Sequence, residues 1–264
     1  MKNAWILFTI LLLLVAQAFG DQDAQAGRQI VAKWQDAVVT VQLVLKTSMS
    51  FEGEQAQNQE EKSETIGTVI DPSGLVVVSL SALNPAEAWQ RMMPNENVKV
   101  SSDVTDVKLI LPDGKEMPAS VVLRDKDLDL AFIRTKDKPA KPLSTVDFKT
   151  AAKPELMDQA IILYRLGTVG SRALAACTDR VQSVIEKPRI LYALGLQAMG
   201  ASLGAPVFAM DSNPIGLLLL RTSPGGMASG AGMFGGIGGT GLMYVVLPAS
   251  DVVDAARQAE NISK

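Results

Sequence analysis

Short apolar runs separated by turn-forming residues recur along most of the chain after residue 36. The run 37–45 alternates apolar and polar positions, which is typical of a β-strand. Asp-Pro-Ser-Gly at 71–74 and Pro-Asp-Gly at 112–114 are turn sequences between such runs. Many short strands with few helical stretches favour an all-β sandwich or barrel. The other predicted strands are 67–70, 75–80, 107–111, 119–124, 128–134, 159–164, 174–183, 191–194, 205–209, 215–221 and 244–247.

Helical spacing is confined to the two ends of the chain, where 21–36 predicts a leading helix and 249–259 a closing helix. Two segments lack a strand pattern. Residues 52–64 are charged and Gln-rich, and we interpret them as a mobile loop or a long hairpin tip. Residues 225–241 are rich in glycine and predict a flexible surface loop. Phosphate binding by this loop is disfavoured, because no Gly-Lys-Ser or Gly-Lys-Thr and no strand-to-helix frame accompany it.

The first twenty residues have the layout of a secretory signal peptide. Lys2 precedes an apolar run from Ala4 to Phe19, and small residues follow at Ala18 and Gly20. The run is shorter than the ~20 residues that a membrane-spanning helix needs. We therefore expect a cleaved signal and an exported chain that begins near Asp21. Contact with a membrane is expected only if the segment stays uncleaved.

The amino-acid composition argues against several kinds of binding and catalysis. A net charge of −3 without runs of Lys or Arg gives no case for nucleic-acid binding. The single cysteine, Cys177, rules out an intrachain disulfide, and its apolar neighbours favour a buried, inert thiol. The chain contains no histidine, so a catalytic cysteine would lack its usual partner. We expect no cofactor and no metal.

Four segments in series resemble the HtrA/Deg branch of the trypsin-like serine proteases. They are Gly67–Val78, similar to G-x-V-I-D-x-x-G-Y-I-L-T; Val107–Lys115 with Asp125–Ile133, similar to D-G-x followed by D-L-A-V-L; Ser202–Val207 with Asn213–Gly216, similar to G-N-S-G-G-P-L with its downstream G-x-x-I-G; and Gly241–Pro248, similar to G-x-G-F-A-I-P. The resemblance implies two antiparallel six-stranded β-barrels packed face to face around a cleft, without the trailing PDZ domain of that branch.

The resemblance, with the segments above, gives an expected domain order for the chain. It is a signal peptide 1–20, a leading helix and linker 21–36, a first β-barrel 37–135, an inter-barrel linker 136–150, a second β-barrel 151–248 containing the Gly-rich loop, and a C-terminal helix and tail 249–264. The expected fold class is all-β, a trypsin-like double antiparallel β-barrel with a short C-terminal helix.

The resemblance fails at the catalytic triad. It places the family's histidine at Ser81, its aspartate at Asp129 and its nucleophilic serine at Leu203, although a shift of one residue would put Ser202 there instead. A serine hydroxyl cannot accept a proton near neutral pH, so the general base is missing. The loop equivalent to the oxyanion hole, Ala201, Ser202 and Leu203, is followed by Ala205 in place of a glycine.

Two enzymatic alternatives stay open. Ser202 could act as a nucleophile with a lysine such as Lys187 as its base, although no local spacing supports that pair. Asp125, Asp127 and Asp129 alternate, which on a strand places their carboxylates on one side, but two of them are better interpreted as turn residues.

The favoured hypothesis is a catalytically inactive, exported pseudoprotease that binds a protein or an extended peptide. Such a peptide could lie along a strand edge, where main-chain hydrogen bonds need no triad. The segments 52–64 and 225–241 are candidate contact surfaces. The alternative is an active serine hydrolase with Ser202 as a non-standard nucleophile.

Overall fold

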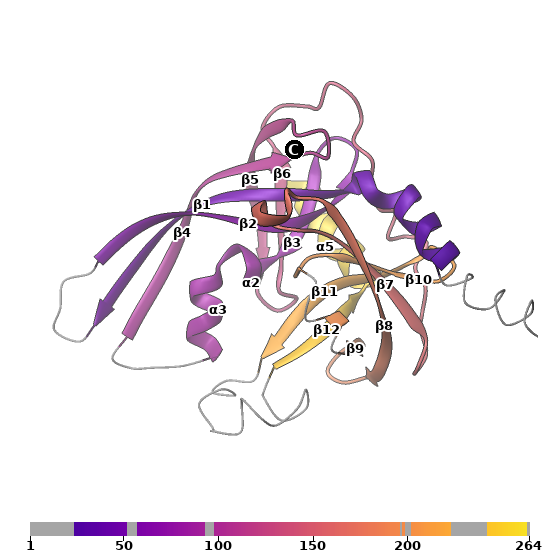
Figure 1. Ribbon diagram of the computed structural model, residues 1–264. Coiled ribbons are helices and arrows are strands. Elements are labelled where there is room, and N and C mark those ends of the chain that lie inside the picture. Colours follow the sequence, from indigo (N-terminus) through magenta and orange to yellow (C-terminus); the bar gives the residue numbers. More distant parts are fainter. Residues whose placement is uncertain are drawn as a thin grey trace, which may run out of the picture.

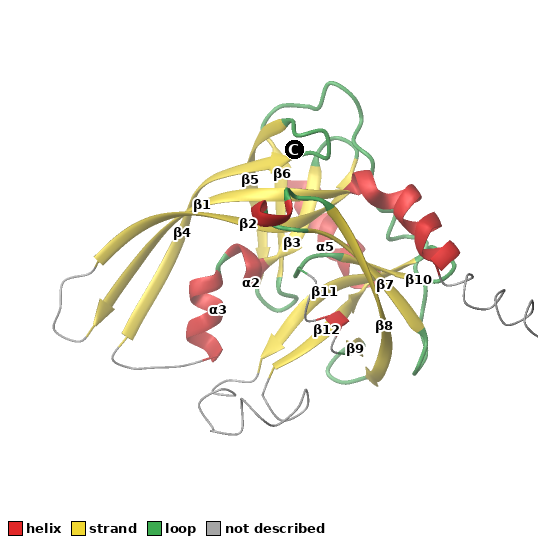
Figure 2. Ribbon diagram, viewed as in Figure 1, coloured by secondary structure: helices red, strands yellow, loops and turns green. Residues whose placement is uncertain are grey.

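Two closed antiparallel barrels make up most of the molecule. The computed structural model describes residues 24–51, 57–92, 98–195, 197–198, 202–222 and 242–262. Barrel 1 has the strand order β1-β2-β3-β6-β5-β4, and barrel 2 has the order β10-β11-β12-β9-β8-β7. Figure 2 shows how strands dominate over helices in both halves. The predicted fold class, a double antiparallel barrel with a C-terminal helix, is confirmed.

The strands of the two barrels follow each other in the sequence. Those of barrel 1 are β1 (Val38–Phe51), β2 (Gln57–Asp71), β3 (Leu75–Ser79), β4 (Val98–Ile110), β5 (Glu116–Asp125) and β6 (Leu130–Thr135). Those of barrel 2 are β7 (Gln159–Arg165), β8 (Leu174–Ile185), β9 (Leu191–Leu194), β10 (Pro206–Ala209), β11 (Pro214–Thr222) and β12 (Leu242–Pro248). The chain from 136 to 158 joins the barrels without a helix or strand.

Helices lie outside the barrels. A leading helix covers residues 24–34 and continues into the 3-10 helix η1 (Gln35–Ala37). The others are α2 (Leu80–Leu83), α3 (Pro85–Met92), the 3-10 helix η2 (Thr168–Gly170) and α5 (Ala249–Ile262). No helix within the described ranges is both long and apolar enough to cross a membrane.

Strands β3 and β6 are almost wholly buried because both of their faces meet a core. On β3, Val76 and Val78 point into barrel 1, whereas Leu75 and Val77 join the core shared with barrel 2. The same alternation, two residues per repeat, holds on β6. An apolar run without polar interruption in this part of the sequence therefore reflects burial on both sides.

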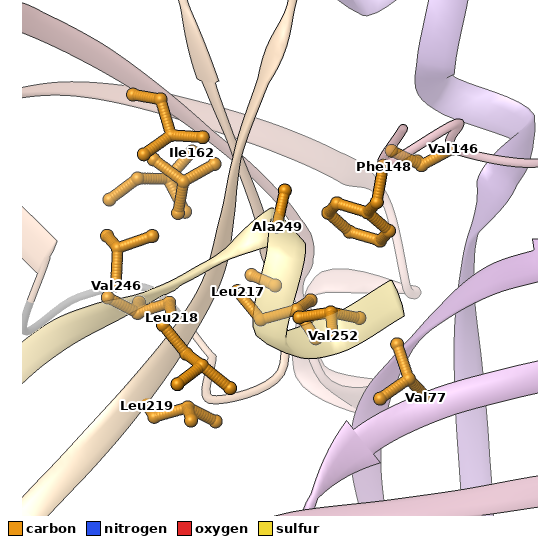
Figure 3. Packing of buried hydrophobic residues seen from close by; sticks show 14 of the residues in the cluster. Val77, Val146, Phe148, Ile162, Leu217, Leu218, Leu219, Val246, Ala249 and Val252 are labelled. Carbon is orange, nitrogen blue, oxygen red and sulfur yellow. The ribbon is translucent and has the colours of Figure 1, made fainter. Parts of the chain in front are cut away.

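The shared core is completed by segments from both ends of the chain. Figure 3 shows Ala249 and Val252 of α5 near Phe148 of the inter-barrel connection, with Leu217 of β11 beside them. At the other end, the indole of Trp34 stacks on Phe208, with ring centroids 5.7 Å apart. Both helices thus pack on the core that the two barrels share.

Strands β1, β2 and β4 continue beyond barrel 1 as a three-stranded arm, seen at the left of Figure 1. Residues 57–64, interpreted as part of a mobile loop or a long hairpin tip, are strand: Gln57 pairs with Met49 and Glu64 with Gln42. The hairpin alternative is therefore confirmed for these residues, and the loop alternative is wrong for them. Their polar side chains, most of them exposed, hide the strand period in the sequence. Residues 52–56 lie outside the described residues.

Other predictions differ from the structure at specific points. The predicted strand 75–80 ends at Ser79, because the Ser79 hydroxyl accepts a hydrogen bond from the Ala82 N–H and caps α2. The sequence pattern did not predict α2 or α3. The predicted signal peptide 1–20 and Gly-rich loop 225–241 lie outside the described residues.

Candidate functional site: a serine–aspartate cluster facing a glycine turn

Asp129 is the centre of a buried polar cluster on barrel 1. One carboxylate oxygen, Oδ1, accepts hydrogen bonds from the backbone N–H of Ser81 at 2.8 Å and from its hydroxyl at 2.7 Å. The other, Oδ2, accepts the Ser79 hydroxyl at 2.9 Å. The side chain of Asp129 is almost fully buried, with 3% relative exposure. Both carboxylate oxygens are therefore engaged by two serines of one segment.

The turn between β5 and β6 brings Asp129 to this position. The carboxylate of Asp125 accepts the N–H groups of Asp127 at 3.0 Å and Leu128 at 2.9 Å, which fixes the turn. Asp129 itself has φ = 61°, a left-handed conformation that aspartate tolerates better than most residues. Its own carbonyl accepts the N–H of Leu80 at 2.9 Å. Backbone and side chain together thus join the turn to the start of α2.

Burial raises the pKa of Asp129 above the ordinary aspartate value. The hydrogen bonds from Ser81 and Ser79 and the positive charge of Arg221 oppose this shift but do not cancel it. The cluster thus keeps a carboxylate where solvent is excluded, and it compensates with three donors in place of an imidazole.

The turn that carries the expected nucleophile packs directly against this cluster. Gly204 has φ = 85°, and a Cβ placed on it would lie 2.9 Å from the backbone nitrogen of Ser79 and 3.0 Å from the carbonyl oxygen of Ile66. Only glycine fits both the conformation and the space. Ser202 and Leu203, half-buried, immediately precede it. The structure therefore packs the Gly204 turn of barrel 2 against the Asp129 segment of barrel 1, and these two segments form the two walls of the site.

Hydrogen bonds join the two barrels on either side of this contact. The buried Thr68 hydroxyl of barrel 1 donates to the carbonyl of Gly204 at 3.1 Å. From barrel 2, the Arg221 guanidinium donates to the carbonyls of Asp127 at 3.2 Å and Leu128 at 3.4 Å. The walls are thus held in a fixed relation by contacts that involve neither Ser202 nor Leu203.

Sequence reasoning identified part of this site. Of the residues singled out, Ser81 and Asp129 are hydrogen-bonded to each other, Ser202 and Leu203 immediately precede Gly204, and Ala201 lies outside the described residues. The roles of Ser79, Thr68, Gly204 and Arg221 were missed. A signal existed for Ser79 alone, since Ser79 and Ser81 alternate with Leu80 just after a strand.

The contacts of the described residues do not support the enzymatic alternatives. Lys187 is exposed in the connection between β8 and β9, and no hydrogen bond joins it to Ser202 in the described part of the chain. The carboxylate of Asp125 accepts hydrogen bonds from two backbone N–H groups of its own turn. Among residues 24–51, 57–92, 98–195 and the later described segments, no three His, Cys, Asp or Glu side chains are grouped as metal ligands.

Cys177 is half-buried, not fully buried as predicted. It lines a cavity of about 540 Å³ in which Ala24 and Gly27 of the leading helix leave space beside the thiol. Burial raises the thiol pKa, and the charge of Asp179 acts in the same direction. Both effects favour the protonated thiol over the reactive thiolate.

The comparisons with known proteins agree with this geometry. No sequence among curated proteins matches the chain. A family model described as a trypsin-like peptidase domain matches residues 65–217, from within β2 to within β11. This match covers more than half of the chain and includes parts of both six-stranded barrels. The chain belongs to the trypsin-like peptidase domain family.

Proposed function

We propose that this protein is an exported pseudoprotease of the HtrA/Deg type, which binds protein or extended peptide and does not hydrolyse it. One observation carries the proposal. In a chain without histidine, the carboxylate equivalent to the triad aspartate is occupied by Ser79 and Ser81 at 2.7–2.9 Å. Asp129 therefore serves as an acceptor for the capped start of α2, and it orients no base.

The loss of turnover expected without a triad serine or histidine supports inactivity. In triad enzymes, loss of the serine or of the histidine alone lowers turnover by about 10⁶, nearly as much as loss of the whole triad. The position of the histidine is Ser81 in this chain, and Leu203 stands at the nucleophile position in the gapless alignment. Two of the three catalytic groups are replaced, one of them by a side chain without a reactive atom.

An edge of strand β11 supports peptide binding. The Leu218 N–H donates to the carbonyl of Ala205 at 2.9 Å, and its carbonyl accepts the Gly204 N–H at 2.7 Å. Backbone groups alternate along a strand, so those of Leu220 and Thr222 point to the same side as those of Leu218. In the described part of the chain, no strand pairs with β11 on that side beyond Leu217. An extended peptide can add there by main-chain hydrogen bonds.

The HtrA/Deg assignment and export rest on the sequence. Four segments follow that branch in order, including Gly67–Val78 and Asp125–Ile133. The apolar run from Ala4 to Phe19 after Lys2 supports export to the periplasm or the medium through a cleaved signal. Expression of the full chain, with N-terminal sequencing of the exported product, tests this part: a mature chain that begins near Asp21 supports it.

A covalent serine-hydrolase probe tests catalysis. We expect the purified mature protein to be unlabelled by a fluorophosphonate and to leave casein intact from about pH 5 to pH 9, the range in which triad proteases titrate. Labelling that disappears in Ser202→Ala would establish the active-hydrolase alternative and overturn the proposal. The variant Leu203→Ala is the matched control, because it alters the same turn without removing a hydroxyl.

Binding is tested separately with fluorescein-labelled β-casein, an extended protein substrate. Saturable binding, measured by fluorescence anisotropy, with no cleavage of the bound casein supports the proposal. Amide hydrogen exchange locates the contact, since an added strand should slow exchange at Leu220 and Thr222. Unchanged exchange at these amides in a saturated complex contradicts binding at the edge of β11.

A further inference from the structure

A cavity of about 480 Å³ lies beside the turn between β4 and β5. The inter-barrel connection forms another part of its wall, and Asp36 of η1 completes it. The described residues that line it include none of β11 and none of the Asp129 cluster. Its volume falls within the roughly 300–1,000 Å³ that is usual for small-molecule sites. The cavity is therefore a separate candidate site, independent of peptide binding at the edge of β11.

Apolar side chains make up much of the lining of this cavity. Met117 of β5 and Pro139 of the connection are buried, and Leu111 and Leu143 are half-buried. Both leucines also pack against the core of barrel 1. Transfer of apolar surface from water into such surroundings is favourable, roughly in proportion to the area removed from water. The lining thus suits a ligand with an apolar body.

Backbone contacts hold the walls of the cavity in place. In the turn, the Leu111 N–H donates to the carbonyl of Lys115 at 2.9 Å. In the connection, the Leu143 N–H donates to the carbonyl of Pro72 at 3.1 Å. Three of the lining residues are prolines, whose rings restrict the backbone further. The cavity is therefore preformed, and a ligand would not have to order its walls on binding.

Two lysines at this cavity are available to an anion. Lys115 and Lys141 line it and are exposed, and in the described part of the chain no ion pair or hydrogen bond engages either ammonium group. The two carboxylates of the lining have a donor or a cation of their own. Asp113 accepts the Lys115 N–H at 2.9 Å, and the charge of Asp36 opposes the effect of burial on the pKa of Arg165. The ammonium groups thus favour a negatively charged ligand.

We infer that this cavity binds a small amphipathic carboxylate. Its apolar body lies against Met117 and Leu143, and its carboxylate lies within reach of the flexible side chains of Lys115 and Lys141. Ion pairs with exposed lysines contribute little each, so the apolar body supplies most of the affinity and the lysines supply the preference for a negative charge.

Isothermal titration calorimetry of the purified mature protein with dodecanoate tests the inference. We expect saturable binding at one site, about tenfold or more tighter than binding of octanoate, since each additional buried methylene adds to the affinity. Dodecylamine has the same chain length and the opposite charge, and it should bind about tenfold more weakly. Lys115→Gln combined with Lys141→Gln should weaken dodecanoate binding by about tenfold and leave dodecylamine no weaker than before.

Lys138→Gln is the matched control, because this lysine is exposed on the same connection and is not among the lining residues. It should leave dodecanoate binding unchanged. Ala140 is exposed and lines the cavity, so Ala140→Trp should fill the space and abolish binding while the circular dichroism spectrum stays that of the folded protein. Undiminished binding to the folded Ala140→Trp variant would place dodecanoate elsewhere and overturn the inference. Equal affinity for dodecanoate and dodecylamine, or no saturable binding of dodecanoate, would also overturn it.

Discussion

The two walls of the site are held by different kinds of contact. On barrel 1, the hydroxyls of Ser79 and Ser81 satisfy the carboxylate of Asp129. On barrel 2, the tight turn around Gly204 fits through its backbone, because a Cβ there would meet Ser79 and Ile66. One wall depends on polar side chains, and the other depends on the absence of a side chain.

This difference shows which features the fold itself requires. A buried carboxylate without donors would be costly, so Asp129 needs its hydrogen bonds from Ser79 and Ser81. Position 203 makes no comparable demand, because a half-buried apolar side chain there leaves no charge unpaired. Glycine is needed at position 204 because the contact between the barrels depends on this turn.

The largest predicted effect follows from Gly204→Ala. The new Cβ would meet the backbone of Ser79 and Ile66 at 2.9–3.0 Å in a left-handed conformation. Backbone strain and the steric overlap together should lower the free energy of unfolding by about 3–5 kcal/mol. Urea denaturation monitored by tryptophan fluorescence measures this loss.

Gly114→Ala is the matched control, since Gly114 has φ = 83° and no atom within 4 Å of the added Cβ. It should lower the free energy of unfolding by about 1 kcal/mol, because only the left-handed conformation is unfavourable for alanine there. Equal losses in both variants would mean that the Gly204 turn does not pack tightly on barrel 1, and the contrast between the two walls would then lose its structural basis.

Replacement of Asp129 should have the next largest effect. Asp129→Ala leaves two serine hydroxyls and the N–H of Ser81 without their acceptor, which should destabilise the protein by about 3 kcal/mol. Asp129→Asn keeps an acceptor for Ser81 and can donate to the Ser79 hydroxyl, so its cost near neutral pH should be about 1 kcal/mol or less. Similar losses in both variants, measured by the same denaturation, would contradict a structural role for the acceptor.

Much of the fold could be predicted from the sequence, because strands with one buried face carry a period of two. The limits of β7 and β9 follow directly from apolar runs between turn residues. The outer half of β2 could only be predicted as a loop or a hairpin tip, since residues 58–62 are exposed and carry no apolar period. Helix α2 depends on a cap formed by Ser79, and this serine is also bonded to Asp129, fifty residues away.

The site was predictable only as positions in a family pattern. Ser81, Asp129 and Leu203 could be placed because their neighbours resemble known motifs. What those residues do in this chain depends on contacts between distant segments, such as Thr68 with Gly204 and Arg221 with the turn at Asp127. A single sequence gives no local pattern for such contacts, because they are made by the packing of one barrel on the other.

The pH dependence of stability distinguishes a buried carboxylate from an exposed one. The folded protein raises the pKa of Asp129 above its unfolded value of about 3.9, so the folded state binds the proton more tightly. Stability relative to Asp129→Asn should therefore be greatest below pH 4 and fall as the pH rises through the raised pKa. Denaturation of both proteins from about pH 4 to pH 8 measures the difference. A difference that grows in favour of Asp129 with rising pH would mean that the hydrogen bonds outweigh burial.

The smallest predicted effect concerns an ion pair that joins the two barrels through residues other than those of the Asp129 cluster and the Gly204 turn. Arg172 of barrel 2 donates to Glu64 on β2 at 2.6 Å, and the glutamate side chain is 16% exposed. A double-mutant cycle with Arg172→Gln and Glu64→Gln should show a favourable coupling that weakens at high salt, because solvent reaches the arginine. The pair Lys108–Glu116, which lies within barrel 1 and is more exposed at 39% and 53%, provides the control and should couple less. Equal coupling in both cycles would mean that this ion pair adds nothing specific to the contact between the barrels. The hydrogen bonds of Thr68 and Arg221 and the shared core would then be the contacts that hold the two walls together.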